Sequence, residues 1–132
     1  MIDFKRMRDL MRAMPDLLWK VSVAQANASR VTSAITGMPH GGGQNHQEDG
    51  YIKLAEIREV YREAEAELEG MRKELETLLE AYDDARGKAY LRYRYINGRT
   101  IAEIAEAESK DPSTVFRIIQ QAEWSIMRAQ NA

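Results

Sequence analysis

The most regular pattern of apolar and polar positions lies in residues 51–85, where apolar side chains recur at alternating steps of three and four. This spacing lines up one stripe along a helix and is typical of a coiled-coil seam. The stripe comprises Leu54, Ile57, Tyr61, Ala64, Leu68, Met71, Leu75, Leu78, Tyr82 and Ala85. Glutamates fill many of the positions outside it, which predicts a long helix with a solvated outer face.

A second apolar stripe precedes this one and comprises Phe4, Met7, Met11, Met14, Leu18, Val21, Ala28 and Ile35. Pro15 interrupts it. Because proline removes a helical hydrogen bond and disfavours helical geometry in the residue before it, we expect a kink or a break there. Between the two stripes, residues 37–50 (GMPHGGGQNHQEDG) hold five glycines and a proline, which predicts a loop.

Two apolar stripes of similar length joined by a short loop predict a long antiparallel helical hairpin, coiled-coil-like, over residues 1–86. Charge agrees with this interpretation. Residues 1–47 carry six Lys and Arg against three Asp and Glu, and residues 48–85 carry five against thirteen, so the two segments are about +3 and -8. Opposite charge favours packing side by side. Homodimerisation through the same seam stays open.

Composition favours an all-α fold, because Ala, Glu, Leu, Arg and Met are abundant while glycine and proline are sparse outside the loop. The 132 residues suffice for one domain, or for a small domain plus an extended helical element. Cysteine is absent, which excludes disulfides and thiolate metal sites, and no apolar run approaches the roughly 18 residues of a membrane span. We therefore expect a cytoplasmic protein without membrane contact.

Residues 87–132 predict a separate module. Residues 88–96 indicate a short helix, and the Asn97-Gly98 pair that follows is suited to a left-handed cap. Thr100 and Glu103 have the spacing of a capping box at the start of the next helix. Asp111 caps a third helix, and Pro112 occupies its first position. The last two helices form a helix-turn-helix pattern.

One side of the last predicted helix is apolar at 100° per residue, and it comprises Val115, Ile118, Ile119, Ala122 and Ile126. The opposite side is polar. Arg and Gln are side chains that hydrogen-bond guanine and adenine edges in the major groove, and hydroxyls suit phosphates. We expect Ser113, Thr114, Arg117, Gln120 and Gln121 to face bases and Arg99, Lys110 and Arg128 to face phosphates, with Thr100 completing the DNA-binding set. An ordinary solvated helix face is the alternative.

An enzyme is not expected. His40 and His46 both lie in the predicted loop, and a stable zinc site needs about four ligands. The many carboxylates follow a solvated helical face instead of converging on a pocket. We therefore predict no catalytic residues, no metal site and no cofactor.

The stretch YLRYRYINGRTIAEIAEAESKDPSTVFRIIQQAE resembles region 4 of sigma-70-type factors, and in particular the ArpU-like late transcription regulators of phages and prophages. Upstream, VTSAITGMPHGGG followed by EDGYIKLAEI is similar to the connection in those proteins between an N-terminal helix and a long central helix. The resemblance implies a DNA-binding regulator of phage genes with host RNA polymerase as a partner. It also implies that Ala105 lies where two helices cross and that Val115 and Ile118 are buried.

The sequence departs from the family pattern at the turn. Ser109 stands where a glycine is usual, and Glu108 and Lys110 stand where apolar residues flank that turn, which predicts a longer or looser connection. Two other functions fit the same layout: a DNA-packaging subunit of the small-terminase kind, which joins a helix-turn-helix to a coiled coil in a ring, and an interaction protein that binds polymerase or a sigma factor without reading DNA.

Overall fold

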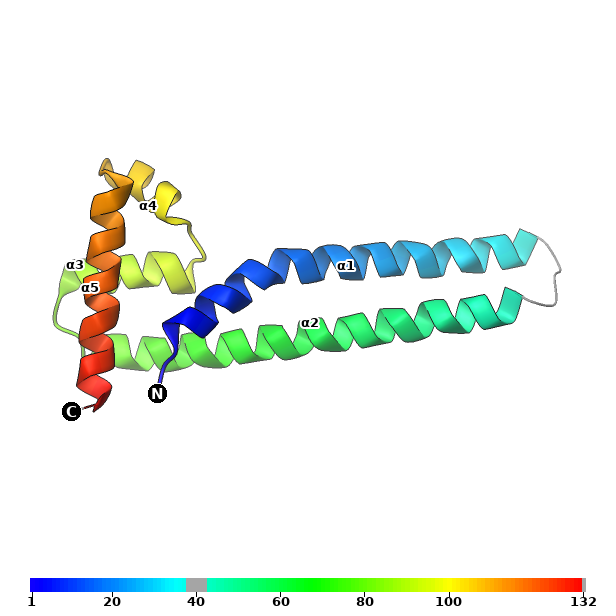
Figure 1. Ribbon diagram of the computed structural model, residues 1–132, viewed down its shortest axis with the longest axis horizontal. Coiled ribbons are helices and arrows are strands. Elements are labelled where there is room, and N and C mark those ends of the chain that lie inside the picture. The colour runs from blue at the N-terminus through cyan, green and yellow to red at the C-terminus, as the bar shows by residue number, and fades with distance from the viewer. Residues whose placement is uncertain (38–42, 132) are drawn as a thin grey trace. The chain divides into compact units, whose positions relative to one another are not determined.

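Every regular element of the described residues is helical, which confirms the all-α class (Figure 1). The computed structural model describes residues 1–37 and 43–131, with side chains described for residues 1–30 and 49–131. The elements are α1 (Phe4–Gly37), α2 (Gly43–Glu80), α3 (Ala85–Leu91), the π-helical turn η1 (Arg92–Ile96), α4 (Ile101–Glu108) and α5 (Pro112–Asn131). None of these helices is long and apolar enough to span a membrane.

The chain packs as two compact units. The first unit combines Met1–Asp9 with Leu68–Ala132, and the second is Leu10–Glu67. Each long helix therefore contributes one end to the first unit and the rest to the second. The boundaries of these packing units differ from those of the functional domains predicted at residues 1–86 and 87–132. The division into functional domains stays a prediction.

In the second unit, the α1 and α2 segments lie side by side and run in opposite directions (Figure 1). Ala24, Ala28 and Leu54 form the buried cluster between them, and Val21 and Ile57 pack against it. Two of the three buried side chains are alanines, so the two backbones approach closely.

The N-terminal stripe differs from the predicted one. Leu18 is 51% exposed, whereas Leu17 is half-buried and Ala24 is buried. The predicted step from Met14 to Leu18 was therefore wrong by one residue, since the apolar side of α1 continues through Leu17 instead. α1 also runs through Pro15 without a break.

The loop predicted over residues 37–50 is shorter than expected. α2 begins at Gly43, so residues 43–50 are helical in spite of their glycines. The long regular helical segment that follows can extend into these residues. Adding a residue to an existing helix costs less free energy than nucleating a new one, which offsets the low helix propensity of the glycines. Residues 38–42, with His40, lie outside the described residues, as does the side chain of His46.

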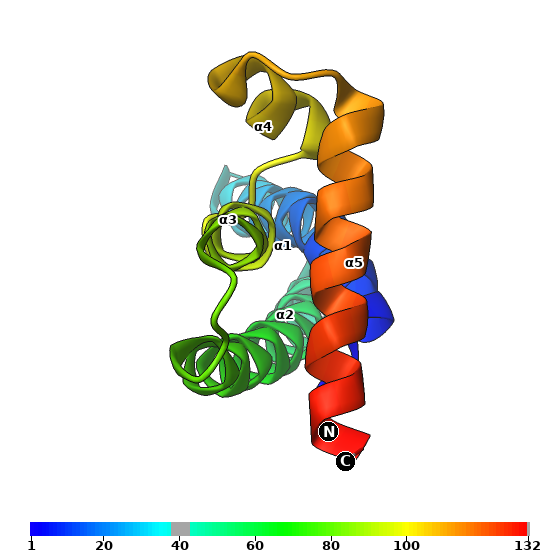
Figure 2. The same ribbon diagram turned by 90° about the vertical axis from the view of Figure 1, so that its left-hand side faces the viewer.

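The first unit gathers α3, η1, α4 and α5 (Figure 2). The helix predicted from residue 88 begins earlier, at Ala85, where the carboxylate of Asp84 accepts a hydrogen bond from the backbone N–H of Arg86. α5 packs against both α3 and α4. The buried side chains of this unit are Ile2, Phe4, Met7, Leu68, Leu75, Leu79, Tyr90, Leu91, Tyr95, Ile104, Ala105, Val115, Ile118, Ile119, Ala122 and Ile126.

Candidate nucleic-acid interface

α4 begins at a complete capping box. The Thr100 hydroxyl accepts from the backbone N–H of Glu103 at 3.1 Å, and the Glu103 carboxylate accepts from the backbone N–H of Thr100 at 3.1 Å. The hydrogen bond from the Thr100 backbone is the main cause that lowers the pKa of Glu103. The predicted cap is therefore confirmed, and it fixes where α4 starts.

The turn between α4 and α5 is tight. Ser109 adopts the left-handed conformation, with φ 53° and ψ 46°. Its backbone N–H donates to the carbonyls of Ala105 and Glu106, and the N–H of Lys110 donates to the Ala105 carbonyl at 2.9 Å. These bonds satisfy the last carbonyls of α4 as in a Schellman cap. The prediction of a longer or looser turn is wrong, because serine here takes the conformation that glycine usually supplies.

α5 starts at Pro112, as predicted, and the carbonyl of Asp111 accepts from the N–H groups of Thr114 and Val115. Its apolar side is buried at all five expected positions: Val115, Ile118, Ile119, Ala122 and Ile126. Ala105, Val115 and Ile118, singled out by the family resemblance, are 3%, 0% and 8% exposed. The turn and this buried face together set which side of α5 meets solvent.

The predicted DNA-contacting side chains of α5 share that solvent side. Ser113, Arg117, Gln120, Gln121 and Arg128 are exposed, and Thr114 is half-buried. Positions 113, 117, 120, 121 and 128 fall within about 100° of arc on a helix with 3.6 residues per turn. The structure thus brings five of the six together on one free face.

Three predicted residues lie outside α5, and all three are exposed: Arg99, Thr100 and Lys110. Arg99 stacks its guanidinium over the Tyr93 ring, 5.1 Å from the ring centre. Such a contact restrains the side chain while leaving its N–H groups able to donate. The hydroxyl of Thr100 accepts a hydrogen bond in the capping box, which leaves its O–H able to donate to a phosphate.

Two polar side chains of α5 also have local partners. Ser113 donates its hydroxyl to the Asp111 carboxylate at 2.9 Å. The guanidinium of Arg128 lies 5.3 Å from the centre of the Trp124 ring. The Asp111 carboxylate would oppose a phosphate at Ser113.

Large apolar side chains accompany the polar ones. Phe116 is 52% exposed, Trp124 is 65% exposed and Met127 is 37% exposed. Phe116 and Trp124 therefore have little cover from the described residues of this chain. Their exposure leaves a mixed polar and aromatic face on α5.

A partly buried polar network holds the middle of α5. Arg8 donates from the same guanidinium nitrogen to the Tyr95 hydroxyl at 2.9 Å and to the Glu123 carboxylate at 2.8 Å, and Tyr95 also donates to Glu123. Phe4 packs on the Tyr95 ring with 5.2 Å between ring centres. The network therefore ties the start of the chain to the helix that carries the candidate interface.

Burial is the largest cause of the pKa shifts of Glu123 and Tyr95. Desolvation raises the pKa of Glu123 above its usual range, although the hydrogen bonds and charges of Tyr95 and Arg8 act the other way. Desolvation, together with the hydrogen bond to Glu123, also raises the pKa of Tyr95. Tyr95 and Glu123 lie 87 and 115 residues from Arg8 in the sequence, so no local sequence pattern predicts this network.

The π-helical turn η1 is braced by α2. The N–H of Asn97 donates to the carbonyl of Arg92, five residues back, at 2.9 Å. The wider turn leaves the Tyr95 carbonyl to accept from the Arg72 side chain at 2.7 Å. A second link joins Arg92 to Glu76 at 3.5 Å. Tyr95 is thus anchored through its backbone as well as through its hydroxyl.

Residues 29–127 match the family described as "Protein of unknown function (DUF1492)", and the chain belongs to this family. The match contains all of α2, α3 and α4 with the turn that follows, and most of α5. Comparisons with curated proteins and with solved structures found no match. Among the described residues, no group of three or more His, Cys, Asp or Glu side chains is placed to hold a metal ion.

Proposed function

We propose that the protein is a sequence-specific DNA-binding transcriptional regulator of phage or prophage type. In this proposal α4 and α5 form a helix-turn-helix like that of sigma region 4, and α5 is the recognition helix in the major groove. The single observation that carries it is the free polar face of α5, with Arg117, Gln120 and Gln121 exposed directly opposite five buried apolar side chains.

The capped geometry supports this role. The capping box at Thr100 and the left-handed turn at Ser109 hold both ends of α4, so α5 leaves the turn in one defined direction. A recognition helix needs this rigidity, because base contacts require hydrogen-bond distances of about 3 Å.

Cations frame the polar face. Residues 86–132 carry eight Lys and Arg against five Asp and Glu, a net charge of about +3. We assign Arg99, Lys110 and Arg128 to phosphates. Each phosphate contact releases counterions, so the slope of log K against log salt changes by about 0.9 per contact. Replacement of Lys110 by alanine would lower this slope and weaken binding to all sequences alike.

The decisive variant is Arg117→Ala. Arg117 is exposed, so the fold should persist, and loss of a bidentate contact to guanine weakens specific binding by about 1–3 kcal/mol, or roughly 5- to 150-fold. Arg58→Ala is the matched control, since it removes the same charge from an exposed position on α2 in the other unit. Fluorescence anisotropy with a selected DNA target measures both, and equal affinities for the two variants would refute the assignment.

A second candidate function rests on the aromatic residues of α5. Phe116 and Trp124 are more than half exposed, and exposed aromatics are enriched where proteins bind other proteins. This favours a factor that binds polymerase or a sigma factor through α5. Co-purification with polymerase that is abolished by Phe116→Ala, combined with an absence of DNA binding, would select this function over the first.

A further inference from the structure

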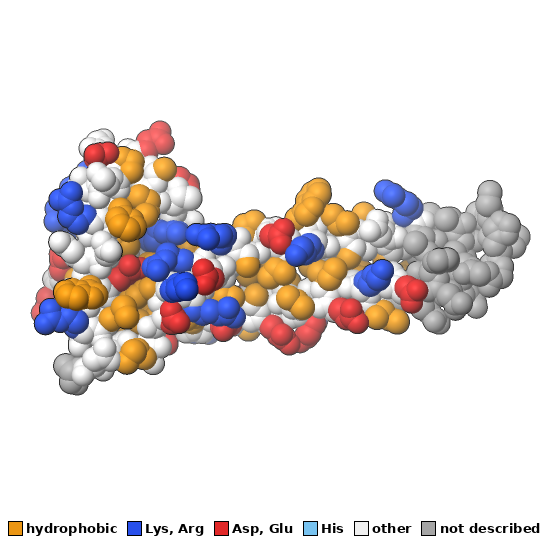
Figure 3. Space-filling view, viewed as in Figure 1, with side chains coloured by type: hydrophobic (Ala, Val, Ile, Leu, Met, Phe, Trp, Pro, Cys, Tyr) orange, Lys and Arg blue, Asp and Glu red, His pale blue; other side chains and the backbone are white. Residues whose placement is uncertain are grey.

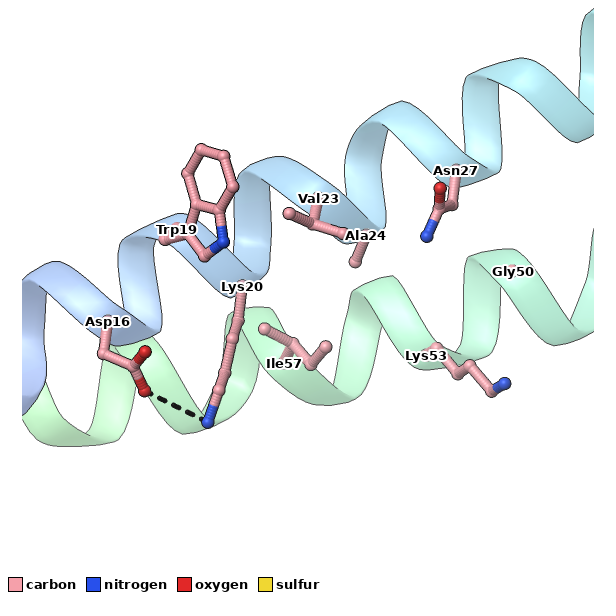
Figure 4. A pocket seen from close by; sticks show the side chains of 9 residues that line it. All are labelled: Asp16, Trp19, Lys20, Val23, Ala24, Asn27, Gly50, Lys53 and Ile57. Carbon is pink, nitrogen blue, oxygen red and sulfur yellow. Dashed lines mark ion pairs between the residues drawn. The ribbon is translucent and has the colours of Figure 1, made fainter.

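Exposed aromatic side chains occur in two different settings in this chain. In the first setting they belong to an apolar cluster. Figure 3 shows apolar side chains gathered along both α1 and α2 in this view. Trp19, which is 67% exposed, lies at a hollow of about 370 Å³ that Val23 and Ile57 also line (Figure 4).

Phe116 of α5 has the second setting. It is 52% exposed. In the described part of the first unit, the other exposed large apolar side chains are Met1, Trp124 and Met127. Trp124 and Met127 lie about 12 Å and 16 Å farther along the axis of α5, at about 1.5 Å per residue. Phe116 is therefore a single exposed ring on its part of the helix.

This ring lies at one edge of the free polar face of α5. At about 100° per residue, the exposed side chains of Gln120 and Ser113 lie about 40° and 60° around the helix from Phe116. Ser113, Arg117 and Gln120 mark the middle of the face. Gln121 lies about 70° from this middle on one side, and Phe116 lies about 70° from it on the other. The two residues thus border the same face symmetrically.

Phe116 also lies at the end of α5 that would read bases. It is the fifth residue of the helix and directly precedes Arg117. In helix-turn-helix proteins, residues near the N-terminus of the recognition helix contact base edges in the major groove. When Arg117 reaches a base edge, the Phe116 ring therefore lies in the groove as well.

We propose that Phe116 is a specificity-determining residue whose ring packs against the C5-methyl group of a thymine. This inference rests on the proposed function, since it requires α5 to lie in the major groove. The thymine methyl is the apolar group that base pairs present in that groove, where the other groups are hydrogen-bond donors and acceptors. A single apolar ring beside hydrogen-bonding side chains matches this pattern.

The spacing of the two residues locates the thymine. The Cα atoms of consecutive residues lie about 3.8 Å apart, and successive base pairs lie about 3.4 Å apart. The thymine contacted by Phe116 is therefore within about two base pairs of the base contacted by Arg117.

A protein partner fits Phe116 less well than DNA does. The core of a protein–protein interface joins several apolar side chains into one patch. Phe116 is about 12 Å along the helix from Trp124, with Arg117 and Gln120 exposed between them, so the two rings do not form one patch.

Replacement of thymine by deoxyuridine tests the proposal, because it removes the methyl group and keeps the pairing with adenine. A target is first selected from random double-stranded DNA, and the guanine whose preference is lost with Arg117→Ala is located in it. Each thymine within two base pairs of this guanine is then replaced in turn, and fluorescence anisotropy measures affinity at one salt concentration. The wild-type chain should bind about fourfold more weakly at one of these positions, the factor that a buried methyl group contributes.

Three variants assign this discrimination to a side chain. Phe116→Ala should bind the thymine and deoxyuridine sites equally, whereas Phe116→Leu keeps an apolar contact and should retain most of the difference. Trp124→Ala is the matched control, since it removes an exposed ring from the same helix and should keep the full difference. Circular dichroism checks that all three variants stay helical.

The outcomes separate this proposal from the proposed function. A selected target that requires Arg117 but shows no difference between thymine and deoxyuridine would overturn the role of Phe116 and leave DNA reading by α5 intact. A difference that persists in Phe116→Ala would overturn it equally, as would a target without thymine near the guanine. Capture of polymerase that is lost with Phe116→Ala, while this variant still discriminates, would assign the ring to a protein interface instead. Selection of no target would refute the proposed function itself and the role of Phe116 with it.

Discussion

Ser109 is the residue of the α4–α5 turn whose backbone conformation is least suited to its side chain. Its φ of 53° lies in the left-handed region, where an L-residue costs about 1–2 kcal/mol relative to its right-handed conformation. Glycine adopts the same geometry without this cost. It also increases the entropy of the unfolded chain, which offsets about 0.4–1 kcal/mol of the gain. The variant Ser109→Gly should therefore stabilise the first unit by about 1 kcal/mol.

Ser125 provides the matched control for the same chemical change. It is an exposed serine inside α5, where glycine is a poorer helix former by roughly 0.5 kcal/mol, and its hydroxyl donates to the Gln121 carbonyl at 3.0 Å. Ser125→Gly should therefore destabilise the unit. The two variants differ in sign because one serine is strained and the other is helical.

Urea denaturation followed by circular dichroism at 222 nm measures both changes. Ser109→Gly should move the urea midpoint upward. In a thermal melt, the same gain of about 1 kcal/mol should raise the melting temperature by roughly 3–6 °C for a chain of this size. Should Ser109→Gly destabilise the protein as Ser125→Gly does, then Ser109 is not in the left-handed conformation and the tight turn is wrong.

Two other predictions concern the same unit. A Cβ added at Gly87 would lie 3.2 Å from the Ala122 Cβ and 3.1 Å from the Tyr82 ring, whereas one at Gly70 meets nothing within 4 Å. Gly87→Ala should therefore lower the urea midpoint, while Gly70→Ala should raise stability by about 1 kcal/mol. Equal effects of the two variants would refute the close α3–α5 packing. Because the pKa of Glu103 is lowered in the folded state, its ionised carboxylate stabilises the fold above the unfolded pKa, and this stabilisation is lost as pH falls through the folded pKa. Glu103→Gln should therefore destabilise the protein more at pH 7 than at pH 3. A difference in urea midpoint that does not change with pH would contradict the charged capping box.

Local sequence rules predicted the C-terminal helices well. The buried face of α5 followed from 100° periodicity alone, and the starts of α4 and α5 followed from Thr100 and Pro112. These features depend on neighbours within one or two helical turns, which are visible in the sequence. The error at Ser109 has the opposite origin, because local preference disfavours the left-handed conformation and only the hydrogen bonds back to Ala105 and Glu106 hold it.

The remaining differences arise from interactions between distant residues. The network of Arg8, Tyr95 and Glu123 joins three helical segments that are far apart in the sequence, so no periodicity marks it. The choice of Leu17 over Leu18 depends on where α2 packs, since both leucines fit an apolar helix side. Of the candidate interface, the set of exposed polar residues was predictable, whereas the exposure of Phe116 and Trp124 was not.

Selection of bound sequences from random double-stranded DNA by the full chain tests the central claim most directly. The account predicts an enriched motif, whose enrichment disappears with Arg117→Ala and persists with Arg58→Ala. Recovery of no motif from the wild-type chain, at salt concentrations where nonspecific binding is suppressed, would contradict the assignment of α5 as a DNA-reading helix.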